Sequence, residues 1–329
     1  MRKRIASMLL VLAMLAGFSG SAFAAEDAAA RLPAKNELNA QWFKNRPATS
    51  FNRDIALMAA CLTSNEGEFK TRYGAPGKPL AMEEFSAGAF WFGVEHPVWK
   101  IGSIQLKDAT IVVVKLNGSG AFGSGQYLVT NFMGYGGYAV KSEPHFGYRV
   151  EAGYKSYADA VWEGLSGLKH LFEGKGNLKL LITGHSMGGA GANLLGVRLE
   201  KEDNICGTKL SREDIYVYTF ESPSIYLDLF EPHSGTQFGN IHNFVNSVDI
   251  AVLFMPGQRF GKTYMFPCVS PENDRHHPNY QEYRQAIDAV NPAYQAQRSW
   301  IGNILVWAAM SIIQLVAVDL FGGPLTRFL

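Results

Sequence analysis

The sequence is poor in features that mark several large protein classes. It has three cysteines, Cys61, Cys206 and Cys268, which are too few and too scattered for a disulfide framework or a zinc site. At most one disulfide bridge can form among them. Charged residues make up 18% of the chain, and 30 Lys and Arg stand against 29 Asp and Glu, so no excess of positive charge favours a nucleic acid. We therefore predict no nucleic-acid partner.

The chain also lacks internal repeats, low-complexity tracts and any linker strong enough to divide it. Hydrophobic residues account for 47% of its 329 residues, which is enough to bury a substantial core and excludes a disordered or collagen-like chain. We predict one catalytic-size domain over residues 51–299. Residues 25–50 contain Pro33 and Pro47 and show no sustained period, so they predict a loosely held N-terminal lead-in.

Both ends of the chain carry apolar segments. Arg2, Lys3 and Arg4 precede an apolar run, and the small residues up to Ala24 are typical of a signal-peptidase site. We predict an export signal over residues 1–24 and a periplasmic or secreted protein; the alternative is an uncleaved anchor. Residues 300–329 are predicted to form a hydrophobic helix. Its segment 301–321 is long enough to cross a bilayer but contains polar residues, so membrane association and a core or dimer helix both stay open.

Four runs rich in apolar and β-branched residues predict buried strands, and helical patterns lie between them. The strands are expected at 109–116, 178–183, 215–220 and 241–248, and the helices at 52–63, 149–172 and 188–200. Strands that alternate with helices indicate a mostly parallel sheet covered by helices. The fold class predicted is therefore α/β.

A Gly-x-Ser-x-Gly motif follows the second of these strands directly. It spans residues 184–188, places Ser186 at its centre, and precedes a helix that begins with small residues. A strand, a sharp turn and a helix are the context in which such a serine projects above the sheet as a nucleophile. We predict that Ser186 is the nucleophile of an acyl-transfer reaction.

A serine hydroxyl needs a base, and in this kind of fold the chain order is serine, acid, histidine. Asp249 follows the last predicted strand and is the preferred acid; Asp228 and Glu231 are competitors in the preceding loop. Only two histidines lie downstream, His276 and His277. We favour His277, which precedes Pro278 at the end of a loop, and His276 stays an alternative.

The tetrahedral intermediate of acyl transfer needs fixed N–H donors for its oxyanion. The first donor expected is the backbone N–H of Met187, immediately after the nucleophile. The second should come from the loop after an earlier strand, where Asn117-Gly118-Ser119-Gly120 lies, and Ser119 is the candidate. The chemistry requires neither a metal nor an organic cofactor.

The motifs together resemble the class 3, or fungal-type, lipase family of α/β-hydrolases over roughly residues 50–285. GHSMGGA (184–190) is similar to the family's GHSLGGA, YTFESP (218–223) to its YTFGSP, VNSVDI (245–250) to its acid-bearing VNxxDxV, and HFGY (145–148) to its HxGF. The resemblance implies an α/β-hydrolase fold, with Ser186, Asp249 and His277 as the triad and Ser119 and Met187 as oxyanion donors. It also implies a lid over residues 120–144; an ordinary hairpin is the alternative.

The sequence departs from the family pattern at two points. Asn117-Gly118-Ser119 replaces the family's RGT or RGS, and Glu221 replaces its usual glycine. The resemblance implies an exported lipase or carboxylesterase that acts on lipid or small esters and contacts a lipid surface. A phospholipase A1 or an acyltransferase would use the same residues, and a catalytically silent module that binds lipid or a partner is the alternative from another class.

Overall fold

A seven-stranded sheet forms the centre of the chain in a computed structural model, which describes residues 32–87, 98–118, 142–225, 237–246, 258–266 and 278–290. The strand order is β1-β2-β3-β6-β9-β10-β11. The strands are β1 Met82–Ser86, β2 Val98–Gln105, β3 Thr110–Leu116, β6 Leu178–His185, β9 Ile215–Phe220, β10 Ile241–Asn246 and β11 Lys262–Phe266. The first three pair antiparallel, and the five from β3 to β11 pair parallel. The mostly parallel sheet predicted from the sequence is thus confirmed.

The four predicted strands are present because their apolar side chains are buried on both faces of the sheet. In β9 and β10 every residue is buried, and β3 has a single partly buried position, Lys115. β1, β2 and β11 were not predicted from the sequence. Their patterns mix buried and partly exposed residues, as suits β1 and β11 at the two ends of the sheet.

The helices begin at side chains that accept a backbone hydrogen bond from the first turn. Their bounds are α2 Ala40–Lys44, α3 Arg53–Ser64, α4 Glu66–Tyr73, α6 Ala152–Gly167, α7 Met187–Glu202 and α9 Tyr280–Asp288. Asn52 caps α3, as the sequence predicts, and Asn279 caps α9 in a box with Glu282. Single 3₁₀ turns lie at Lys35–Glu37, Lys169–Leu171 and Arg212–Asp214.

The helix predicted at 149–172 is shorter in the structure. Residues Tyr148–Glu151 form β5, which pairs antiparallel with β4 (Ser142–His145), and α6 begins only at Ala152. The side chain of Glu151 accepts from the N–H of Tyr154 and so starts the helix after the hairpin. A second small hairpin joins β7 (Asn204–Ile205) to β8 (Thr208–Lys209).

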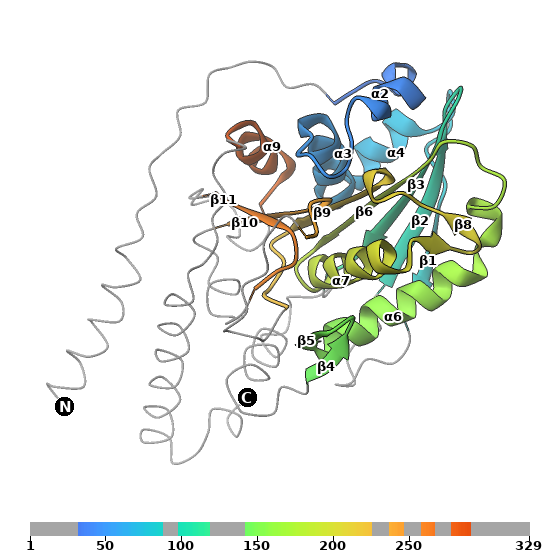
Figure 1. Cartoon of the computed structure of the whole chain (residues 1–329). Helices are drawn as coiled ribbons and strands as arrows, with labels where there is room; N and C mark the ends of the chain where they lie inside the picture. Colours follow the sequence, from blue (N-terminus) through green and yellow to red (C-terminus); the bar gives the residue numbers. More distant parts are fainter. Residues whose placement is uncertain are drawn as a thin grey trace, which may run out of the picture.

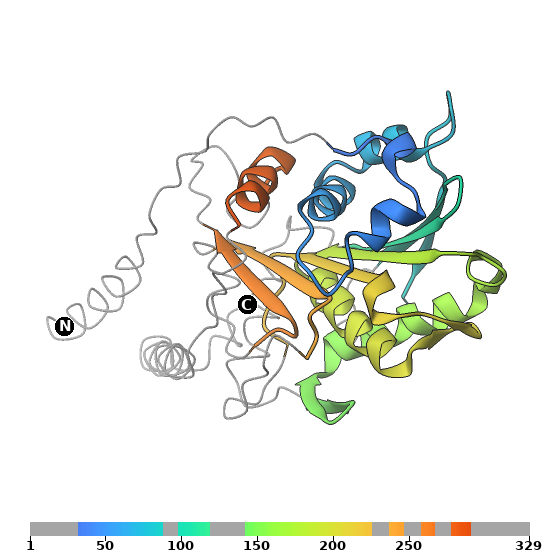
Figure 2. The same ribbon diagram turned by 45° about the horizontal axis from the view of Figure 1, so that its top comes forward.

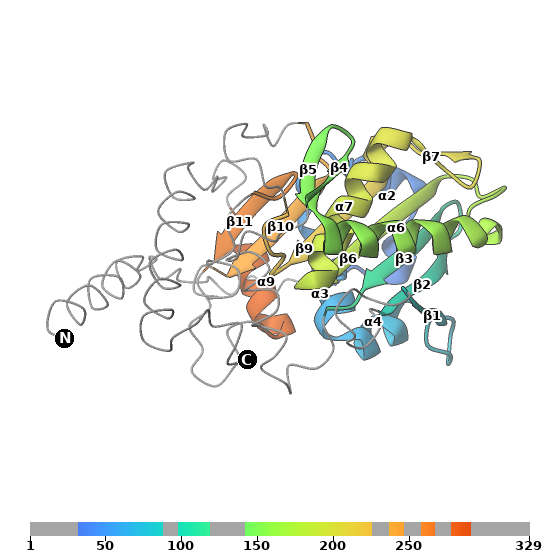
Figure 3. The same ribbon diagram turned by 90° about the horizontal axis from the view of Figure 1, so that it is seen from below.

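Two separate apolar cores lie on opposite faces of the sheet. Alternate residues of each strand divide between them: Val112 and Val114 face α6 and α7, whereas Ile111 and Val113 face α3, α4 and α9. Figure 1 shows the two helical layers above and below the sheet, and Figure 3 shows α6 and α7 crossing it. Figure 2 shows that α3 and α9, far apart in sequence, lie side by side. Helices on both faces of a mostly parallel sheet confirm the predicted α/β-hydrolase architecture.

The N-terminal segment is packed rather than loosely held from residue 32 onward. Leu38 and Phe43 are buried in the core that also contains α3, and the N–H of Ala48 donates to the carbonyl of Glu213 at 2.9 Å. The hydroxyl of Tyr216 donates to the carbonyl of Arg46 at 2.8 Å. The sequence does not predict this packing because the apolar residues follow no helical or strand period.

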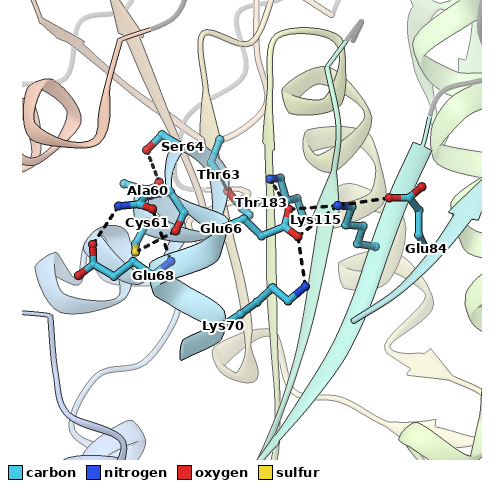
Figure 4. Close-up of polar contacts among 12 residues, drawn as sticks. Ala60, Cys61, Thr63, Ser64, Glu66, Glu68, Lys70, Glu84, Lys115 and Thr183 are labelled. Atoms are coloured by element: carbon cyan, nitrogen blue, oxygen red, sulfur yellow. Dashed lines mark hydrogen bonds and ion pairs between the residues drawn. The ribbon is translucent and has the colours of Figure 1, made fainter. Parts of the chain in front are cut away.

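A cluster of ion pairs ties α4 to the sheet (Figure 4). The carboxylate of Glu66 lies 2.8 Å from the ammonium of Lys115 on β3 and 3.1 Å from that of Lys100 on β2. Burial opposes the charge of Glu66, but these two lysines outweigh burial and lower the pKa of the carboxyl group. Nearby, the hydroxyls of Thr63 and Thr183 share a 2.7 Å hydrogen bond that joins α3 to β6.

Candidate functional site

Ser186 lies at a sharp turn between β6 and α7. Its backbone has φ 54° and ψ −125°, a combination that non-glycine residues rarely adopt, and its N–H donates to the carbonyl of Phe220 at 2.9 Å. The residue is buried at 9% exposure and occupies the N-cap position of α7 without a side-chain capping hydrogen bond. This is the strand, turn and helix context that the motif predicts, and the strained serine stands at the carboxyl end of the parallel strands.

Glycines allow three backbone segments to meet at this turn. A Cβ atom on Gly188 would lie 2.2 Å from the carbonyl oxygen of Leu116 at the end of β3, a distance that real Cβ atoms do not show. A Cβ atom on Gly118 would lie 2.9 Å from the carbonyl oxygen of His185 and 3.4 Å from the Cβ of Ser186. The loop after β3 therefore runs directly beside the candidate nucleophile.

The start of that loop is held from below by Tyr157 on α6. Its hydroxyl lies 2.8 Å from the carbonyl oxygen of Val98 and 3.2 Å from that of Asn117. Burial raises the pKa of the Tyr157 hydroxyl, so the group stays protonated and acts as a donor. The N–H of Asn117 donates to the same Val98 carbonyl at 3.0 Å. Asn117 and Gly118 are thereby fixed next to the elbow.

A buried network of amide and hydroxyl groups supports α7 against β9, β10 and β11. The side-chain amide of Asn193 on α7 donates to Asn243 Oδ1 at 2.8 Å and to the carbonyl of Phe260 at 2.9 Å. The hydroxyl of Thr219 donates to the same Asn243 oxygen at 2.6 Å. Such side chains need partners when they are buried, so the network fixes the helix that follows Ser186 relative to the strands beside it.

Of the predicted site residues, the structure describes Ser186 and Met187. Met187 is the first residue of α7, so its backbone N–H belongs to the helical turn that begins at the carboxyl end of β6. Ser119, Asp249, His276 and His277 lie outside the described residues, as do the competitors Asp228 and Glu231. The predicted lid (120–144) is likewise undescribed up to residue 141, and so are the two terminal segments, 1–24 and 300–329.

The described neighbours of the other three residues lie at one edge of the sheet. Gly118, one residue before Ser119, contacts the elbow, and Asn246, three residues before Asp249, ends β10. Asn279 caps α9 two residues after His277, and Tyr283 in the first turn of α9 packs on Phe220 with a ring separation of 4.6 Å. Phe220 ends β9, the neighbour of the nucleophile strand.

Glu221 is a further residue at this edge, and the sequence marked it only as a departure from a family pattern. It follows β9 directly, has φ 49°, and is fully buried. Its carboxylate accepts a 2.7 Å hydrogen bond from the N–H of Asn246. A lone carboxylate beside apolar strands carries no sequence signal for burial, because the hydrogen bond that stabilises it comes from a strand 25 residues away.

Neither of the described cysteines competes with Ser186 as a nucleophile. Burial raises the pKa of the Cys61 thiol to about 12, with a further contribution from Glu68, and burial also raises the pKa of Cys206. Both are free thiols, and Cys268 lies outside the described residues.

Two further searches concern metals and membranes. Within the described ranges, no group of three or more His, Cys, Asp or Glu side chains is placed to hold a metal ion. Among the same residues, no helix has both the length and the apolar character needed to span a bilayer.

Comparison with known proteins supports the family that the motifs suggest. Residues 113–259 match the family model described as lipase (class 3), so the resemblance is confirmed over a range that includes the elbow, β9 and β10. No curated protein matches the chain.

Several solved lipase structures are also similar to the chain. A Rhizomucor miehei lipase in complex with its propeptide is 14% identical, with 81% of this chain and 80% of that one covered and a TM-score of 0.44. The lipase of Rhizopus microsporus var. chinensis is 16% identical, with 80% and 94% covered and a TM-score of 0.43. A fungal lipase–inhibitor complex is 17% identical, with 71% and 83% covered and a TM-score of 0.45.

Proposed function

We propose that this chain, whose residues 113–259 match the class 3 lipase family, is an exported serine hydrolase that cleaves carboxylic esters of lipids. The match supports a carboxylic ester hydrolase with a serine nucleophile. The observation that carries the proposal is the backbone of Ser186, which is held at φ 54° and ψ −125° between β6 and α7. Strain of this kind, about 1–3 kcal/mol, persists where the surrounding structure imposes it, and it lifts the hydroxyl above the sheet edge.

The proposed reaction proceeds through an acyl-enzyme. Ser186 Oγ attacks the ester carbonyl carbon while His277 takes its proton, and Asp249 orients the imidazole and stabilises its charged form. His277 then returns the proton to the leaving alcohol, and water, activated by the same histidine, releases the carboxylic acid. The positions of Asn246, at the end of β10, and of Asn279, at the cap of α9, support this assignment because Asp249 and His277 lie three and two residues from them.

The oxyanion donors we propose are the backbone N–H groups of Met187 and Ser119. Met187 begins α7, so its N–H adds the positive end of the helix dipole to the hydrogen bond. The close approach of Gly118 to Ser186 supports the other donor, because Ser119 is the next residue. Each such donor is worth roughly 3 kcal/mol of transition-state stabilisation in other serine hydrolases.

The remaining predictions about organisation also stay proposals. They are an export signal over residues 1–24, a hydrolase domain over 51–299, a hydrophobic C-terminal helix over 300–329 and contact with a lipid surface. Since residues 32–50 pack into the core beside α3, we propose that they belong structurally to the hydrolase domain.

The test is ester hydrolysis by the wild type and by Ser186→Ala, with p-nitrophenyl esters of graded chain length and an emulsified triacylglycerol. We expect Ser186→Ala to lower kcat by at least about 10³-fold and to abolish labelling by a fluorophosphonate. Ser166→Ala, at an exposed serine of α6, is the matched control and should behave as wild type.

The chain-length optimum of the wild type separates a lipase from a short-chain esterase. His276→Gln and His277→Gln, measured in parallel, decide the base, since only the true base should reach the level of Ser186→Ala. A folded wild type that turns over none of these esters and no phospholipid would contradict the proposal in favour of a silent lipid-binding module. Labelling of Ser186→Ala at the wild-type rate would also contradict it.

A further inference from the structure

Glu221 interrupts the regular course of β9 at the point nearest to Ser186. The preceding residue, Phe220, accepts the N–H of Ser186 through its carbonyl, and Glu221 itself has φ 49° in the left-handed region. That conformation suits glycine, which the related motif carries at this position, and is uncommon for a glutamate. A non-glycine residue with a fully buried carboxylate at a strained position requires a compensating interaction.

The compensating interaction follows from the register of β9 and β10. The N–H groups of Val217 and Glu221 donate to the carbonyls of Asn240 and Phe244 at 3.1 and 2.9 Å. In a parallel ladder with this register, the next donor, the N–H of Asn246, should bond to the main-chain carbonyl of Glu221. It bonds instead to the side-chain Oε2 of Glu221, at 2.7 Å. The carboxylate thus stands in for the strand's own carbonyl where β9 turns away.

This substitution adds one rung to the ladder on the side of β10 that leads to Asp249. Asn246 is the last residue of β10, and three residues separate it from Asp249. An acceptor on Asn246 fixes the point from which that short connection starts. A hydrogen bond from an N–H to a buried carboxylate is also stronger than one to a neutral carbonyl.

We propose that Glu221 is a positioning residue for the catalytic acid: its buried carboxylate completes the β9–β10 ladder at Asn246 and so sets the place of Asp249 relative to Ser186. The inference rests on the proposed function, because it assigns Asp249 the role of the acid. Glu221 itself touches neither substrate nor nucleophile in this role.

The experiment compares three substitutions of Glu221 in the full-length protein, with p-nitrophenyl ester turnover and thermal unfolding measured for each. Glu221→Gln keeps the size, the backbone strain and an amide oxygen that accepts from Asn246, so its kcat should stay within about threefold of wild type. Glu221→Leu has a similar size but no acceptor, so kcat should fall about tenfold or more with KM nearly unchanged. Rescue by glutamine but not by leucine distinguishes the acceptor from mere space filling.

Glu221→Gly guards against a leucine variant that fails to fold. Glycine adopts φ 49° without strain, and it too lacks the acceptor, so we expect a folded protein whose kcat is reduced as in Glu221→Leu. Wild-type kcat in a folded Glu221→Leu or Glu221→Gly variant would overturn the positioning role.

Ser186→Ala and Asp249→Asn, measured beside these variants, separate the inference from the function on which it rests. Loss of turnover in both, with normal turnover in Glu221→Gly, would leave the hydrolase standing and remove Glu221 from it. Retention of turnover in Asp249→Asn together with its loss in Glu221→Gln would overturn the inference, since Glu221 would then be the acid itself. Wild-type turnover in Ser186→Ala would overturn the proposed function and, with it, the role of Glu221.

Discussion

At the scale of single residues, the site depends on positions where side-chain volume or backbone geometry is unusual. Ser186 and Glu221 both have positive φ, at 54° and 49°, and they lie at the ends of adjacent strands, β6 and β9. Each conformation costs about 1–3 kcal/mol, which the surrounding core offsets. Gly188 contributes in the opposite way, because its missing side chain lets α7 approach the backbone at the end of β3.

Substitution of Gly188 by alanine tests this close approach. The new Cβ would meet the carbonyl oxygens of Leu116 and Asn117 at 2.2 and 2.6 Å, and backbone atoms cannot move aside as a flexible side chain can. We expect the free energy of unfolding to fall by about 2–4 kcal/mol and kcat to fall at least about tenfold, because the elbow must shift.

Gly67→Ala on α4 is the matched control, since a Cβ there would meet no atom within 4 Å. We expect it to leave kcat unchanged and to raise the free energy of unfolding by up to about 1 kcal/mol. Denaturant unfolding and ester turnover measure both effects. Equal stability of the two variants would show that the approach is not tight.

At the scale of elements, a single histidine connects three strands to the N-terminal segment. His242 on β10 stacks on Tyr218 of β9, with ring centroids 4.9 Å apart, and on Tyr264 of β11. Its Nε2–H donates to the carbonyl of Ala48, and its Nδ1 accepts from the Tyr264 hydroxyl at 3.1 Å. Burial is the main cause that lowers the pKa of His242 to about 3, so the ring is neutral in the folded protein.

The neutral state of His242 predicts a pH dependence of stability. An unfolded histidine binds a proton as the pH falls below about 6.5, whereas the folded one does so only near 3. The stabilisation is therefore complete above pH 6.5 and is lost progressively as the pH falls toward 3. His242→Phe should be less stable than wild type by about 1–3 kcal/mol at pH 7, because Ala48 and Tyr264 lose a partner.

Denaturant unfolding of the two proteins at several pH values checks this prediction. The difference in the free energy of unfolding should narrow between pH 6.5 and 4, since only the wild type loses stability through this residue. His170→Asn, at an exposed histidine, is the control and should follow the wild-type curve. A difference between wild type and His242→Phe that stays constant with pH would rule out a neutral buried ring.

At the scale of the whole molecule, the sheet needs a cover on both faces, and the N-terminal segment supplies part of one. α6 and α7 cover one face (Figure 3), whereas α3, α4, α9 and residues 32–50 cover the other (Figure 1). Phe43 is 3% exposed and its ring lies 5.8 Å from that of Tyr216 on β9. The segment is thus as much a part of the core as the helices beside it.

Phe43→Ala tests whether this layer contributes to folding. The loss of a buried aromatic side chain and the cavity that it leaves should lower the free energy of unfolding by about 3–5 kcal/mol. Phe146→Ala removes a phenylalanine that is 42% exposed and should change stability by no more than about 0.5 kcal/mol. The same loss in both variants would show that residues 32–50 are not part of the cooperative unit.

The sequence by itself determined the strands β3, β6, β9 and β10, the helices α3 and α7, and Ser186 as the nucleophile candidate. These features are local: a buried parallel strand needs a continuous apolar run, and an elbow needs glycines at fixed spacing around its serine. The small helical layer over residues 32–50 and the strands β1, β2 and β11 were not predictable in this way, because distant segments bury them.

Only the tertiary structure decided what Glu221 and His242 do. Both are polar residues in apolar surroundings, and their local sequence is equally compatible with exposure. Their burial is stabilised by hydrogen bonds to Asn246, Ala48 and Tyr264, none of which is a sequence neighbour. Periodicity records which face of an element is apolar, whereas the partner of a buried polar group depends on the register between strands.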